Sequence, residues 1–164
     1  MMKRLIMISI FILPMLSHAA AGDKHHHHSS DKHHEHKSLA GEPVVIGSFD
    51  RVIEVDLLDS MRFKFAAEPE IKSGESIKFV VRNQGNVPHE FSIGTAEEHE
   101  KHRMMMQNHP DMHHTDGNTV TVAPGETETL IWKFGNLASV IVACNIPGHF
   151  EAGMNYTLEL QAPE

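Results

Sequence analysis

An apolar strand pattern leads directly into a loop with three metal-binding side chains in residues 140–154, VIVACNIPGHFEAGM. Cys144 follows the apolar run, His149 comes five residues later and Met154 five after that, which gives the spacing Cys-x4-His-x4-Met. The Pro147-Gly148 pair predicts a turn that folds the chain back between the first two. A thiolate, an imidazole and a thioether on one tight loop can converge on a single ion. The stretch therefore predicts a strand followed by a metal-binding loop.

A fourth ligand has to come from elsewhere in the chain, and His89 is the best candidate. It lies in residues 86–91, NVPHEF, between two segments expected to be strands. Two His and one Cys in a trigonal plane with a distant axial Met form the blue-copper arrangement, which is an electron-transfer site. The four residues therefore predict one copper ion held by His89, Cys144, His149 and Met154.

Three other interpretations of these residues are weaker. A lone Cys at the end of a strand is often a buried small hydrophobe, and His89 taken alone would suit a surface loop. A Cys–His pair can also act as a nucleophile, but no oxyanion or acyl-transfer motif accompanies it. A module that scavenges zinc or nickel through its His clusters would explain neither Cys144 nor Met154. The order and spacing of all four residue types favour copper.

Period-two alternation of apolar and polar residues, the strand signal, runs through the rest of the chain from Pro43 onward. Turn sequences rich in Gly, Pro and Asn separate the alternating runs at residues 72–75, 83–86 and 123–126. About seven or eight short strands over some 120 residues predict an all-β, antiparallel sandwich with one buried and one wet face per strand. The runs lie at residues 53–57, 61–65, 77–81, 120–122, 130–134, 140–142 and 156–160.

Several motifs together resemble the plastocyanin/azurin-like cupredoxins over about residues 44–160. The His- and Met-rich additions are similar to those of the periplasmic copper-tolerance cupredoxins. The motifs are Asp59-x-Met61-x-Phe63, Gly74-Glu75, Phe79-x-Val81-x-Asn83, His89-Glu90-Phe91-x-Ile93-Gly94, Ala123-Pro124-Gly125-Glu126 and Cys144-Asn145-Ile146-Pro147-Gly148-His149-x4-Met154.

The resemblance implies a cupredoxin-type Greek-key β-sandwich with a type 1 copper bound by the four candidate residues. One position departs from the pattern: many plastocyanin-like members have Asn after the first His, where it braces the ligand loops, and this chain has Glu90. Multicopper oxidases and nitrite reductases pass electrons to a second copper through a His next to the Cys. Here the neighbours are Ala143 and Asn145. We therefore expect a protein that is not itself an oxidase or reductase.

A charged insertion at residues 95–117 interrupts the strand pattern, and residues 96–107 within it predict a short helix. Its Met and His side chains are candidate ligands of accessory copper, because thioethers favour Cu(I) and imidazoles serve both oxidation states. The alternative is that the Met residues fill the core while the His residues are solvated. The candidates are His99, His102, Met104, Met105, Met106, His109, Met112, His113 and His114.

The first 42 residues have two different compositions. Residues 1–21 read as a secretory signal peptide with a basic start, an apolar run of about a dozen residues and small residues at its end. Residues 22–42 form a polar tail that we expect to be disordered. A purification tag, a solubilising tail and a metal-collecting tail are the three interpretations, and the last is preferred. The tail histidines are His25, His26, His27, His28, His33, His34 and His36.

The net charge limits which functions remain for this chain. With 14 basic against 22 acidic residues in 164, the chain lacks the basic character of a nucleic-acid binder. We expect a periplasmic monomer with a domain at residues 43–164, no membrane span after signal cleavage and possible recognition of a basic redox partner such as a cytochrome. Two functions compete: copper tolerance by binding, buffering or redox handling of copper, which we prefer, and dedicated electron transfer between periplasmic partners.

Overall fold

The computed structural model describes residues 38–44, 47–109 and 117–163, which contain ten strands and one helix. The signal peptide and the predicted His-rich tail up to residue 37 lie outside these ranges, as do Met112, His113 and His114. The elements are β1 (Gly41–Pro43), β2 (Arg51–Leu58), β3 (Arg62–Phe65), β4 (Ile71–Lys72), β5 (Ser76–Asn83), β6 (His89–Gly94), α1 (Ala96–Asn108), β7 (Thr119–Val122), β8 (Thr127–Phe134), β9 (Ser139–Ala143) and β10 (Asn155–Gln161).

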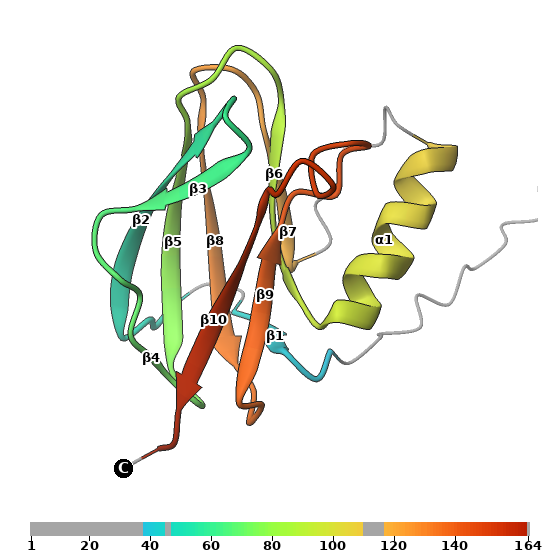
Figure 1. Ribbon diagram of the computed structural model, residues 1–164. Coiled ribbons are helices and arrows are strands. Elements are labelled where there is room, and N and C mark those ends of the chain that lie inside the picture. Colours follow the sequence, from blue (N-terminus) through green and yellow to red (C-terminus); the bar gives the residue numbers. More distant parts are fainter. Residues whose placement is uncertain (1–37, 45–46, 110–116, 164) are drawn as a thin grey trace, which may run out of the picture. The chain divides into compact units, whose positions relative to one another are not determined.

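Two five-stranded sheets form the sandwich, in the orders β1-β8-β5-β2-β3 and β4-β10-β9-β6-β7 (Figure 1). The predicted all-β sandwich is confirmed. The sheets are mixed rather than antiparallel throughout, because β2 pairs with β5 and β10 with β4 in parallel. Parallel neighbours need a long crossover connection. Strands β3 and β4 supply that connection between β2 and β5, and residue alternation alone carries no information about strand direction.

Three strands lie outside the runs predicted from alternation. Strand β6 does alternate, with apolar Phe91 and Ile93 next to polar Glu90 and Ser92, but all six of its residues are buried, so neither face is wet. Strands β1 and β4 have three and two residues, too few for a pattern. Strand β1 pairs with β8 and Ala40 is fully buried, so the sandwich begins before residue 43, the start expected from composition.

Aromatic side chains join the two sheets. Phe91 on β6 packs edge-on against Phe63 of β3, with ring centroids 5.9 Å apart, and lies 5.0 Å from Phe79 of β5. All three are buried. Burying side chains of this size contributes roughly 1.5–3 kcal/mol each. The resulting core fixes β6, the strand that begins with His89.

Helix α1 lies beside the sheet that contains β6 and β9, and follows β6 directly (Figure 1). Thr95 caps its N-terminus in a capping box with Glu98, which satisfies backbone donors at the helix start. His99 and Met106 are buried on its inner face. The helix in the described ranges is too short and too polar to cross a membrane.

Candidate metal centre

The candidate ligands meet because three neighbouring strands bring their ends together. Strands β6 and β9 are antiparallel, so the start of β6 at His89 lies beside the end of β9, after which Cys144 follows. Strand β10 is antiparallel to β9, with Asn155 opposite Ala143, which brings the preceding Met154 to the same end. The β9–β10 loop carries His149 back over this edge.

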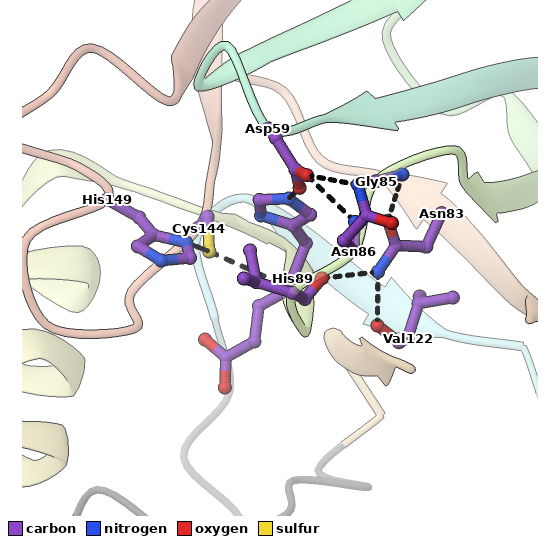
Figure 2. Close-up of polar contacts among 10 residues, drawn as sticks. Asp59, Asn83, Gly85, Asn86, His89, Val122, Cys144 and His149 are labelled. Atoms are coloured by element: carbon purple, nitrogen blue, oxygen red, sulfur yellow. Dashed lines mark hydrogen bonds and ion pairs between the residues drawn. The ribbon is translucent and has the colours of Figure 1, made fainter. Parts of the chain in front are cut away.

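The donor atoms of His89, Cys144 and His149 all lie within 4.8 Å of one another. The Cys144 Sγ lies 3.3 Å from the His149 Nδ1, and the two imidazole rings have centroids 5.0 Å apart (Figure 2). Cys144 and His89 are fully buried, whereas His149 is half-buried. Within the described part of the chain, this is the one place where three or more His, Cys or acidic side chains converge in this way.

Met154 lies at the same site. Its side chain is fully buried, its N–H donates to the His149 carbonyl at 2.9 Å, and its own carbonyl accepts from the Cys144 N–H at 3.1 Å. The backbone of Met154 is therefore tied to two other candidate ligands. The structure thus brings together all four residues singled out in the sequence.

The site suits a metal because the Cys144 thiol is costly to ionise without one. Burial, with a smaller contribution from the Glu90 charge, raises the pKa of Cys144 to about 12 despite two backbone N–H donors that act to lower it. Burial, followed by the effect of His89, lowers the pKa of His149, which keeps that imidazole neutral. A metal ion would displace the thiol proton and supply the positive charge that the buried thiolate lacks. The donor set of one thiolate and two imidazoles fits copper.

Glu90 takes over the bracing role that the resemblance assigns to Asn. Its backbone N–H donates to the Cys144 Sγ at 3.3 Å, and its carboxylate accepts from the Asn145 N–H at 3.2 Å. Glu90 is fully buried, and its carboxylate faces His102 of α1 across 3.8 Å. Glu90 in place of Asn therefore still links the segment that carries His89 to the segment that carries Cys144, and it adds a buried acidic group beside Cys144.

The side chain of Asn145 connects the ligand loop to α1. Its Nδ2 lies 3.2 Å from the His99 Nδ1 and 3.1 Å from the His102 Nδ1, so one amide donates to two imidazoles. The other ring nitrogen of His99, Nε2, donates to the Ile141 carbonyl at 3.0 Å. Sequence reasoning singled out both histidines as metal ligands and gave Asn145 no part, because a helix-to-loop contact leaves no local signal.

Two arginines hold the remainder of the loop. Arg103 of α1 stacks on Phe150 with its guanidinium carbon 3.8 Å from the ring centroid. Arg62 donates to the carbonyls of Ala152 and Gly153 at 3.3 and 3.2 Å. These contacts fix the ligand loop at several points.

The accessory copper candidates that the structure describes differ in their burial. His99 and Met106 face the sheet, and the His102 side chain is 12% exposed, whereas Met104, Met105 and His109 are exposed. A cavity of about 240 Å³ beside the helix is lined in part by His99, His102 and Met105. His99, His102 and Met106 thus share one face of the helix, and that face points to the protein and not to water.

Comparisons with known proteins give concordant results, although no family model matches the sequence. The chain is 43% identical over 133 residues to the copper-resistant cuproprotein CopI of Vibrio cholerae, which covers 81% of this chain and 79% of the relative. It is 32% identical over 188 residues to the protein of that name in Pseudomonas aeruginosa, which covers 97% and 98% of the two chains.

Solved structures with the same fold include auracyanin B, with a TM-score of 0.59 at 20% identity over 74% of this chain and 96% of that one. Auracyanin from Roseiflexus castenholzii gives a TM-score of 0.58 at 16% identity, over 70% and 99% of the chains. Together with the converging Cys and His side chains, this fold defines the class: the protein is a cupredoxin, as the sequence motifs predict. Identities of 32–43% over most of each chain place it further: the chain belongs to the family of copper-resistant cuproproteins CopI.

Proposed function

We propose that this protein binds one type 1 copper through His89, Cys144, His149 and Met154 and acts in copper tolerance in the periplasm. The observation that carries the proposal is the convergence of the His89, Cys144 and His149 donor atoms within 4.8 Å at a buried strand end. The relatives are named for copper resistance, which supports this role over others. When bound, copper supplies one-electron redox chemistry at the site.

The chain's own residues prepare the site for that chemistry. The buried Cys144 and His89 exclude water, and the half-buried His149 gives a path by which electrons enter or leave near the surface. The acidic chain, with a formal charge of -8, would favour a basic redox partner such as a cytochrome. These features support electron-transfer capability as part of the proposal.

The accessory Met and His residues and the His-rich tail distinguish tolerance from the second candidate, a dedicated electron carrier. A carrier needs one copper, whereas a tolerance protein benefits from further sites that collect the ion. Exposed Met104 and Met105 on α1 and exposed His109 at its C-cap are open to such binding. The tail histidines and Met112, His113 and His114 complete the proposed accessory set.

Counting bound copper separates the two functions. Full-length protein is compared with a variant lacking residues 22–37 and with a variant carrying Met104→Leu, Met105→Leu, His109→Gln, Met112→Leu, His113→Gln and His114→Gln, which leave β1 and the buried Met106 in place. Each protein is loaded with copper, dialysed against a weak chelator and assayed for copper per chain and for visible absorption. Copper tolerance predicts more than one copper in the intact protein and a loss in each variant, while the visible band persists. A single copper in all three proteins would support the carrier, and zinc binding in preference to copper would contradict both.

A further inference from the structure

The two ring nitrogens of His89 have different surroundings. The Nδ1 is buried and makes no hydrogen bond within the described residues, whereas the Nε2 lies 3.1 Å from the Asp59 Oδ1 (Figure 2). A neutral imidazole has one donor nitrogen and one acceptor nitrogen. The Asp59 carboxylate can only accept, so it selects the form of His89 that carries its proton on Nε2. The lone pair of Nδ1 is then the one available to a metal.

Asp59 is itself held in place by the loop that precedes His89. Its Oδ2 accepts from the Asn86 N–H at 2.8 Å and from the Asn86 side-chain amide at 3.1 Å. A Cβ on Gly85 would lie only 1.9 Å from the Asp59 Oδ1, so Gly85 leaves the space that the carboxylate occupies. Asn83 completes the loop by accepting from the Gly85 N–H at 2.8 Å.

The surroundings of Asp59 keep it ionised. The side chain is 38% exposed, so water solvates part of the charge. Its two oxygens accept three N–H hydrogen bonds, from the Asn86 backbone, the Asn86 side-chain amide and His89, and such donors favour the carboxylate over the carboxylic acid. A fixed negative charge therefore contacts the far side of an imidazole whose near side faces Cys144 and His149.

We propose that Asp59 is a positioning residue of the copper site, which fixes the proton and orientation of His89 and, through its charge, favours Cu(II) over Cu(I). A carboxylate that accepts from a ligating imidazole makes it a stronger donor, and a nearby negative charge stabilises the more positive ion. The inference rests on the proposed function, since it requires His89 to ligate copper. Neither the family resemblance nor the names of the relatives assign a role to Asp59.

The test compares four variants, each copper-loaded and metal-free. Asp59→Asn removes the charge and leaves one acceptor oxygen, Asp59→Glu keeps the charge, and Gly85→Ala displaces the carboxylate. Glu159→Gln removes an exposed carboxylate from the opposite end of β10 and is the charge control. The reduction potential, the Cu(I) and Cu(II) affinities under competing chelators and the visible and EPR spectra are measured, with thermal unfolding of the metal-free forms.

The proposal expects Asp59→Asn to weaken Cu(II) binding by about 10–100-fold and Cu(I) binding less. A tenfold difference between the two ions raises the one-electron reduction potential by about 59 mV. Gly85→Ala should also raise the potential. Asp59→Glu should give a potential closer to that of wild type than Asp59→Asn does, and Glu159→Gln should leave the potential unchanged. A wild-type potential and affinity in Asp59→Asn would overturn the proposal, whether or not the metal-free variant is less stable.

His89→Ala distinguishes a wrong role for Asp59 from a wrong ligand set. If this variant loses the visible band while Asp59→Asn behaves like wild type, His89 is a ligand and only the role of Asp59 is wrong. If His89→Ala keeps the band and the copper affinity of wild type, the proposed ligand set is wrong, and the inference about Asp59 falls with it.

Discussion

The thiol of Cys144 determines when the proposed site can be occupied. Its pKa of about 12 in the metal-free protein means that it carries a proton at neutral pH. Each copper ion that binds must release this proton, whereas the neutral His149 has none to lose. Burial makes Cys144 an unreactive thiol without metal and a strong ligand with it.

The four candidate ligands are expected to contribute unequally. Cys144→Ser should abolish the intense visible absorption, because that band arises from the thiolate bound to copper. Met154→Leu should keep the copper and the band and raise the reduction potential, since the Met154 thioether would be a weak ligand that tunes the site. Leu fills nearly the same buried space at a cost below about 1.5 kcal/mol. Visible spectra, copper content and voltammetry check both, and an intact band in Cys144→Ser would contradict the assignment.

At the scale of the element, α1 contacts the ligand loop in addition to presenting Met and His side chains. Through His99, His102 and Arg103 it contacts Asn145 and Phe150, which flank the proposed ligands Cys144 and His149. The helix thus acts as an outer support of the ligand loop.

Burial of His99 predicts a pH-dependent stability of the metal-free protein. Desolvation lowers the pKa of His99 below its ordinary 6.5, so the unfolded chain binds a proton there more readily than the folded one. The associated stability is present above pH 6.5 and is lost as the pH falls towards the lowered pKa of the folded state. His99→Gln removes this titration.

Denaturant unfolding of metal-free wild type and His99→Gln between pH 5 and 8 checks this expectation. At pH 8 the variant should be less stable by about 1–3 kcal/mol, because its hydrogen bonds to Asn145 and Ile141 are disrupted. The difference should shrink as the pH falls. A constant difference across the range would show that His99 does not titrate on unfolding.

At the scale of the whole molecule, the site depends on the packing between the two sheets. The sheet with β3 and β5 contributes Phe63 and Phe79, and the sheet with the ligand strands contributes Phe91. The side chain of Phe91 points into the core two residues after His89. The position of His89 is therefore set by the same contacts that stabilise the sandwich.

Phe91→Ala should lower the free energy of unfolding of the metal-free protein by about 3–5 kcal/mol, a large part of the 5–15 kcal/mol typical of a domain. Urea unfolding followed by the fluorescence of Trp132 measures this loss. Val52→Ala, which truncates a side chain 47% exposed on β2, is the matched control and should change stability by about 0.5 kcal/mol or less. Equal losses in both variants would contradict the assigned core.

Most of the fold follows from alternation, because a strand with one buried and one wet face displays that difference in its residues. Strand β6 departs from this rule, because its polar Glu90 and Ser92 are buried as well as its apolar residues, and Glu90 faces His102 of α1. The parallel pairing of β2 with β5 does not follow from alternation either, because strand direction depends on the route of the chain and not on which residues are apolar.

The sequence by itself determined the four candidate ligands, since their residue types, order and spacing are local properties of the β9–β10 loop and of one segment upstream. Only the tertiary structure decided which side chains support them. Asp59 meets His89 across 30 residues, Glu90 meets Cys144 across 54 and Asn145 meets His99 across 46. Such contacts arise from strand pairing and from the packing of α1, which are cooperative properties of the whole domain and leave no periodic or motif signal in the chain.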